Sequence, residues 1–195
     1  MAVERFVRLV LMMSVMVGCS CDHDPGATSS PARAHVDRHA DAEDFAGGIA
    51  WHVVAPLSPH APSSPMRAAE YVVTDHPEAT LAVFHFGAGE GGSVDDNINR
   101  WVDQFSQPDG RSSRDDATIT RGEVGGLPVT YVDVSGSFRG MRGTETASAE
   151  SQRVLGAIVE GPEGLVFFKL SGPIDAVGLA ADAFAETLAS VHAAG

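Results

Sequence analysis

The polar side chains best suited to hold a ligand lie along one predicted helix. Asn97, Arg100 and Gln104 follow one another at intervals of three and four residues, which places them on one face of a helix. Two amides and a guanidinium can together hold a polar or anionic ligand. The same stripe can also be structural, with Arg100 pairing with Asp96 or Gln104. The sequence leaves both interpretations open.

A second candidate contact lies in the segment 136–150, which is rich in glycine, serine and threonine and joins two predicted strands. It is much longer than the roughly 2–5 residues of an ordinary hairpin loop, and long loops are either flexible or functional. Arg139 and Arg142 place two positive charges there, on a chain whose formal charge is -13. We expect them either to contact an acidic partner or to offset Glu145 and Glu150.

One glycine-rich motif imitates a cofactor site. The residues 87–92 satisfy the pattern G-x-G-x-x-G between a predicted strand and a predicted helix, as a dinucleotide fingerprint requires. However, Ser93 is a good helix cap placed after the third glycine, and Asp95 and Asp96 would repel a pyrophosphate at the helix start. We therefore predict a glycine-rich connection and no cofactor.

Other catalytic and metal motifs are not present in the sequence. It contains neither G-x-S-x-G nor H-E-x-x-H. His52 and His85 lie in predicted strands, where core or edge positions are expected. His23, His35 and His39 lie among carboxylates, which allows a metal-scavenging tail, but a flexible segment lacks the supporting contacts that hold ligands in place. We expect a solvated linker there, no metal site and no catalytic residue.

The first 18 residues have the order of a secretory signal. Arg5 and Arg8 precede the apolar run 9–17, and the small Gly18 follows. This run is shorter than the ~20 residues of a membrane span. We therefore predict a signal peptide over 1–18.

The residues that follow resemble the lipobox of bacterial lipoproteins. In Met16-Val17-Gly18-Cys19, the resemblance implies cleavage before Cys19 and attachment of lipid, with palmitate, to that cysteine. Ser20, in place of aspartate, implies sorting to the outer membrane, facing the periplasm or the cell surface. The alternative is ordinary cleavage, which would release a soluble secreted protein.

The next segment, 19–47, is predicted to be a disordered acidic tether. It contains many aspartates and small residues and few large apolar ones, so it cannot bury enough surface to offset the entropy of ordering. Both cysteines, Cys19 and Cys21, precede the predicted domain 48–195, so that domain has no disulfide. The acidic charge argues against nucleic acid as a partner.

The rest of the chain alternates short apolar strands with two amphipathic helices. Prolines at every third position, from Pro56 to Pro65, indicate a stiff connector or a docking ridge. The helices begin at Ser93 and Pro173, and their apolar stripes run from Val94 to Phe105 and from Val177 to Val191. The predicted strands cover 49–55, 66–74, 80–86, 116–124, 128–135, 152–160 and 164–171, with a turn at 75–78 between the second and the third. The last strand contains the run LVFFKL, which is apolar on both faces and should be central. This order predicts an α+β domain, a largely antiparallel sheet of about six to seven strands with two packed helices.

Several stretches resemble an uncharacterised family of exported bacterial proteins over roughly 48–192. They are the strand ending in Trp51, Pro65-Met66-Arg67, Asn97-x-x-Arg100-Trp101-x-x-Gln104, Arg153-Val154-Leu155-Gly156-Ala157 and Phe167-Phe168-Lys169-Leu170-Ser171-Gly172-Pro173. The element order is similar to the PsbP/Mog1-like α/β/α sandwich. That resemblance implies an accessory or binding role and carries no catalytic residue. We expect a membrane-anchored, non-enzymatic lipoprotein that binds a protein or a small ligand. The alternative is an exported, hydrolase-like enzyme whose active site is unrecognised.

Overall fold

The computed structural model describes residues 43–139 and 151–195. The predicted signal peptide, Cys19, Arg142 and most of the predicted tether lie outside these ranges. Three of the eight histidines, His23, His35 and His39, lie outside them as well. Across the described residues, no helix is long and apolar enough to cross a membrane.

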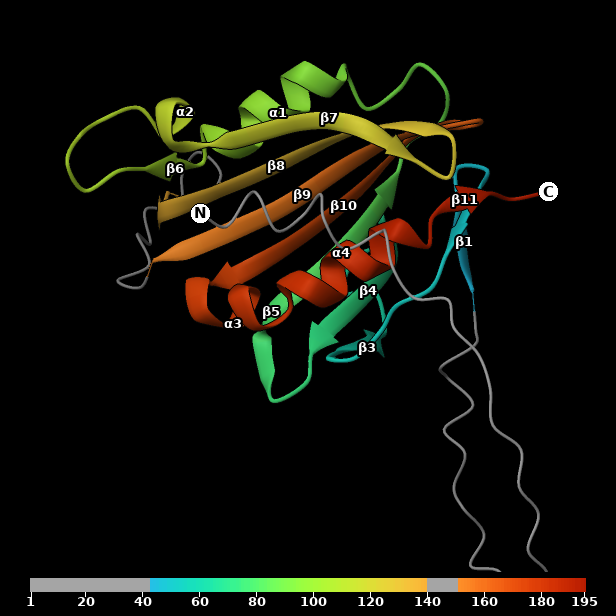
Figure 1. Ribbon diagram of the computed structural model, residues 1–195, viewed down its shortest axis with the longest axis horizontal. Helices are drawn as coiled ribbons and strands as arrows, with labels where there is room; N and C mark the ends of the chain where they lie inside the picture. The colour runs from blue at the N-terminus through green and yellow to red at the C-terminus, as the bar shows by residue number, and fades with distance from the viewer. Residues whose placement is uncertain (1–42, 140–150) are drawn as a thin grey trace, which may run out of the picture. The chain divides into compact units, whose positions relative to one another are not determined.

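The main sheet of the described domain has eight antiparallel strands (Figure 1). Along the sheet the order is β3 (Leu57–His60), β4 (Arg67–Val73), β5 (His76–His85), β10 (Gly164–Pro173), β9 (Gln152–Gly161), β8 (Leu127–Phe138) and β6 (Phe105–Ser106). The eighth strand, β7 (Thr118–Val124), pairs with β8 on the same edge as β6. The apolar segment of β10 lies at the centre of the sheet, as its composition predicted.

A second, smaller sheet corrects the prediction for the start of the domain. Its order is β1 (Asp44–Ala46), β2 (Ile49–Trp51) and β11 (His192–Ala193). The strand predicted over 49–55 ends at Trp51 and pairs in this small sheet, outside the main one. Gly47 and Gly48 both have positive φ and form the tight β1–β2 turn. The strand β1 therefore falls inside the segment predicted to be tether.

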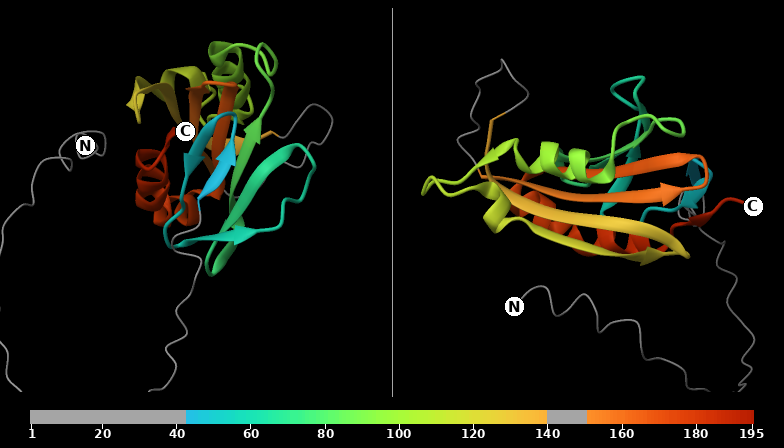
Figure 2. Two further views of the ribbon diagram at one scale, coloured as in Figure 1. Left: turned by 90° about the vertical axis from the view of Figure 1, so that its right-hand side faces the viewer. Right: turned by 90° about the horizontal axis from the view of Figure 1, so that it is seen from above.

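Helices cover both faces of the main sheet (Figure 2). One face carries α1 (Val94–Val102), and the other carries α3 (Ile174–Leu179) and α4 (Ala181–Ala189), while α2 (Ser113–Asp116) is a single turn. The described domain thus has four helices where two were predicted. The single C-terminal helix that was expected divides at Ala180, whose φ of -97° and ψ of 4° leave the helical region.

Two further expectations about the N-terminal half were wrong. Part of the proline-rich segment is not a connector or a ridge but the strand β3, because Pro59 is tolerated on an edge strand. The turn predicted at 75–78 is shorter, lies at Thr74 and Asp75, and places Asp75 at a φ of 65°. Pro77 is accommodated near the start of β5, beyond which regular pairing resumes.

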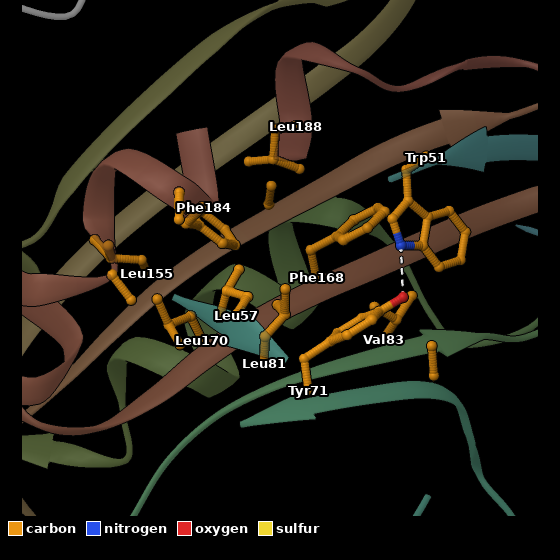
Figure 3. Close-up of a cluster of buried hydrophobic side chains, with 14 of the residues drawn as sticks. Trp51, Leu57, Tyr71, Leu81, Val83, Leu155, Phe168, Leu170, Phe184 and Leu188 are labelled. Atoms are coloured by element: carbon orange, nitrogen blue, oxygen red, sulfur yellow. Dashed lines mark hydrogen bonds between the residues drawn. The ribbon is translucent and has the colours of Figure 1, made fainter. Parts of the chain in front are cut away.

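The face under α3 and α4 is a closed hydrophobic core (Figure 3). Trp51 stands edge-on to Phe168, with ring centroids 5.1 Å apart. The Trp51 Nε1 donates a hydrogen bond of 2.9 Å to the Tyr71 hydroxyl, which in turn donates to Asp44 Oδ2 at 2.5 Å. Burial, and then the Asp44 carboxylate, raise the pKa of Tyr71 far above its ordinary value. These bonds join the small sheet to the core.

Candidate functional site

Helix α1 covers only part of its face of the main sheet. Its buried residues Ile98, Trp101 and Val102 pack over β8, β9 and β10. Beyond them, the same face continues over β10, β5 and β4 with polar side chains. Lys169 lies opposite Ala82, and Ala82 lies opposite Glu70, so these three form one row across the strands.

The row begins on β9 with a glycine that makes room for Trp101. Gly156 lies opposite Lys169, and a Cβ atom at Gly156 would overlap the six-membered ring of Trp101. The indole therefore lies close to the sheet, beside the lysine. The Lys169 Nζ is 5.6 Å from the ring centroid, within the range of a cation–π interaction.

Lys169 is the only lysine of the chain and is half-buried in the middle of β10. Its Nζ donates a hydrogen bond of 3.1 Å to Gln104 Oε1. Desolvation lowers its pKa to about 8, with a further contribution from the positive charge of Arg67. Among the ion pairs of residues 43–139 and 151–195, none includes Lys169. The ammonium group is thus held in place without a carboxylate from the described domain to balance it.

The other charges near Lys169 balance each other. Arg67 Nη1 lies 2.6 Å from Glu70 Oε1, and the Ser63 amide donates to Glu70 Oε2 at 2.6 Å. Burial acts to raise the pKa of Glu70, but the Ser63 amide and Arg67 outweigh it, so the pKa falls below its ordinary value. The Arg67 guanidinium also lies over Phe84, 5.9 Å from the ring centroid.

We refer to Lys169, Gln104, Trp101, Arg67 and Glu70 as the Lys169 cluster. With Glu70 ionised, the formal charges of the cluster sum to one positive charge. The net charge of the cluster is thus opposite in sign to that of the whole chain, whose formal net charge is -13. An arrangement of this kind can hold an anion, because the desolvated cation gains most from an opposite charge in a site of reduced dielectric constant.

The structure divides the helical stripe predicted from the sequence. Asn97 is buried and closes the start of α1, donating to the carbonyls of Gly91 and Ser93, each at 2.8 Å. Arg100 is exposed and donates to Asn97 Oδ1 at 3.2 Å, not to the Asp96 or Gln104 considered from the sequence. Gln104 lies in the turn after α1, which ends at Val102, and not on the helix as predicted, and it is the residue of the stripe that contacts Lys169. Ligand contact by Asn97, Arg100 or Gln104 stays a prediction.

The two arginines of the predicted loop have different outcomes. Arg142 lies outside the described residues. The Arg139 amide donates to the Gln104 carbonyl at 2.8 Å, and the Arg139 residue is exposed. The start of this segment is therefore anchored beside the Lys169 cluster. Partner contact by these arginines stays a prediction.

His52, His85 and the cap after the glycine-rich connection contact other parts of the described domain. His85 is half-buried, and its Nε2 lies 3.2 Å from the Glu163 carbonyl. The backbone of His52 donates to Ser190 Oγ at 3.1 Å. Ser93 Oγ accepts a hydrogen bond from the Asp96 amide at 3.1 Å, which confirms the predicted helix cap after the glycines. Among the described residues, no group of three or more His, Cys, Asp and Glu side chains could hold a metal ion.

A shallow hollow of about 250 Å³ lies elsewhere, between the start of α1 and strands β7 to β9. It is bridged by the ion pair between Arg121 and Asp95, both well exposed, with Nη2 and Oδ1 2.5 Å apart. Such exposed pairs contribute little energy and leave no charge in excess. We therefore place the candidate site at the Lys169 cluster.

Sequence reasoning missed four of the five residues of the cluster. One signal was available: Lys169 is the single charge within the apolar run LVFFKL, which was predicted to be a central strand. A charged residue is rarely placed in such a strand unless it is paired or functional. Two features of the cluster depend on strand register, which the sequence does not give. They are the ion pair between Arg67 and Glu70 and the packing of Trp101 against Gly156.

Comparisons with known proteins show a loose likeness in fold. No model of a protein family matches this sequence, and no curated protein is similar to it. The domain is similar to the solution structure of a cyanobacterial PsbP from Synechocystis sp. PCC 6803, at 12% identity and a TM-score of 0.49, over 84% of this chain and 98% of that one. It is also similar to the crystal structure of LpqN, involved in cell envelope biogenesis of Mycobacterium tuberculosis, at 11% identity and a TM-score of 0.42, over 74% and 82%. A PsbP-like fold was expected from the order of the elements, and the resemblance to an uncharacterised exported family stays a prediction.

Proposed function

We propose that this chain is an exported lipoprotein of the cell envelope whose domain is an accessory binding module, with the Lys169 cluster as its ligand site. The order of charged, apolar and small residues before Cys19 supports export and lipid attachment. The observation that carries the binding role is Lys169. Its ammonium group is desolvated, fixed by Gln104 and Trp101, and left without a carboxylate partner from the described domain.

The proposed role explains why this lysine is there. A methionine or leucine at position 169 would fill the same place in β10 without the cost of desolvating a charge. The cost is compensated when an anion binds beside the ammonium group, because the charged form is then favoured. Arg139 and Arg142 stay our proposed contacts for an acidic partner.

The proposal is tested in the membrane of the producing cell. Wild-type protein and two variants, Lys169→Met and Arg111→Met, are purified with their bound small molecules and proteins, which mass spectrometry then identifies. Arg111 is the matched control, because it pairs with Asp109 and Asp116 on an exposed surface. We expect a bound species that is retained in Arg111→Met and lost in Lys169→Met. Identical sets from all three proteins would contradict the proposal.

One observation favours the alternative, an exported enzyme. An amine with a lowered pKa beside a second cation is the state in which lysine acts as a nucleophile toward carbonyl compounds. Acetone and sodium borohydride provide the test, since reduction of an imine formed with acetone would add an isopropyl group to the only lysine. Rapid modification of the folded protein, but slow modification of the urea-unfolded protein, would favour the enzyme over the binding module.

A further inference from the structure

We infer that the Lys169 cluster binds a monocarboxylate that carries an apolar group. This inference rests on the proposed function, because it names the class of ligand that the same site would take. It follows from the charge of the cluster, from its free hydrogen-bond donors and from the aromatic rings on either side.

The charge of the cluster matches a single negative charge. Arg67 is already paired with Glu70 at 2.6 Å, so within the cluster only the Lys169 ammonium lacks an opposite charge from the described residues. A monoanion brings the sum to zero. A dianion such as inorganic phosphate would leave one negative charge in excess near the buried Glu70, which disfavours it.

The donors of the cluster match a carboxylate. An ammonium group has three N–H donors, and Gln104 accepts one of those of Lys169. The next row along the same face of the sheet places Ser171 opposite Thr80, both half-buried, and adds two hydroxyl groups. A carboxylate has two oxygens that accept from such donors. The small Ala82, between Lys169 and Glu70, adds no bulk above the backbone at this point.

Two aromatic rings flank these donors. Trp101 lies beside Lys169, and Phe84 lies two residues along β5 from Ala82, under the Arg67 guanidinium. Phe84 is half-buried and so is not fully covered by the described residues. Apolar surface next to an anion subsite favours a ligand that joins a carboxylate to an apolar group, because burial of that group adds to the affinity.

The only lysine of the chain gives this inference a direct test. The full chain carrying Cys19→Ser, labelled with lysine enriched in carbon-13 at Cε, has one lysine resonance by nuclear magnetic resonance. The probes are hexanoate, hexanol as the uncharged control, and inorganic phosphate. We expect hexanoate to shift the resonance saturably, with a dissociation constant below about 10 mM, and to raise the pKa of Lys169 by about one unit.

Two variants examine the same site without changing the reporting group. Arg67→Gln should weaken hexanoate binding by about tenfold, because it leaves the Glu70 carboxylate unbalanced and lowers the formal charge of the cluster from +1 to zero. Arg111→Gln should bind as the wild type does, because Arg111 is exposed and forms its own ion pairs with Asp109 and Asp116. Equal weakening by both variants would mean that hexanoate responds only to the overall charge of the protein.

Three results of the probe titration would overturn the inference: no saturable shift with hexanoate, an equal shift with hexanol, or an equal shift with phosphate. Because the Cys19→Ser chain lacks the predicted lipid site, these results are independent of membrane anchoring. If hexanoate does not bind but the membrane experiment finds a molecule that is lost from Lys169→Met, the ligand class is rejected and the proposed binding role is kept. If hexanoate binds but the membrane experiment finds no molecule that is lost from Lys169→Met, the proposed role is rejected.

Discussion

Replacing Lys169 with methionine should change how the stability of the domain depends on pH. The folded-state pKa of Lys169 is about 8, against an ordinary value of 10.5. Between these two values the unfolded chain binds more protons than the folded one, so the free energy of unfolding rises as pH rises. With 1.36 kcal/mol per pKa unit, the wild type should gain roughly 2 kcal/mol between about pH 7 and pH 9.5 from this group alone.

The assay is urea unfolding of the wild type and of Lys169→Met at several pH values within that window. Methionine keeps the length of the apolar stem and removes the charge, and any change in packing is independent of pH. The stability advantage of the variant should therefore shrink by about 2 kcal/mol from pH 7 to pH 9.5. Work above pH 10 is avoided, because the raised pKa of Tyr71 makes the folded state lose stability there. Parallel pH profiles for the two proteins would refute the reasoning.

The remaining predictions concern the anchor and the packing. Cys19→Ser should abolish lipid labelling and release the protein from the membrane fraction, and unchanged fractionation would count against anchoring. Gly156→Ala should lower the free energy of unfolding by about 1–3 kcal/mol, because the added methyl group overlaps the ring of Trp101. An unchanged free energy of unfolding would mean that the indole ring does not pack against β9 at Gly156. Tyr71→Phe should lower the free energy of unfolding by about 1–3 kcal/mol, because Asp44 loses a donor and the buried Trp51 loses its acceptor. An unchanged melting temperature would contradict the hydrogen bonds from Trp51 to Tyr71 and from Tyr71 to Asp44.

Sequence periodicity predicted most of the main sheet. The four strands of the C-terminal half were expected within a few residues of β7 to β10, because glycine-containing turns at 125–126 and 161–164 divide them into two hairpins. Helix α1 was expected from its apolar stripe and its Ser93 cap, although it ends at Val102, and Phe105, the last residue of the predicted stripe, lies in β6. Such local signals are strong because they depend only on neighbours along the chain.

The small sheet and the break in the C-terminal helix could not be predicted in the same way. Strand β11 is two residues long, and its pairing with Ala50 joins segments far apart in the sequence. The stripe from Val177 to Val191 is apolar throughout, so its periodicity does not reveal the change of backbone at Ala180. Tertiary packing decides both features.

The candidate site was only partly accessible to sequence reasoning. Gln104 was identified because its spacing from Arg100 fits a helix, although α1 ends at Val102, and its partner lies 65 positions further along the chain. The meeting of Gln104 with Lys169 depends on α1 packing across β10, and the place of Glu70 depends on the register of β4 with β5. Contacts of this kind follow from the fold and have no local signature.

The most direct test of this account is the pKa of Lys169 in the full chain without added ligand, read from its single lysine resonance during a pH titration. The account predicts a midpoint of about 8, because the ammonium group is desolvated and lacks a carboxylate partner in the described domain. A midpoint at the ordinary lysine value of 10.5 would show that the group is solvated or paired and would contradict the account.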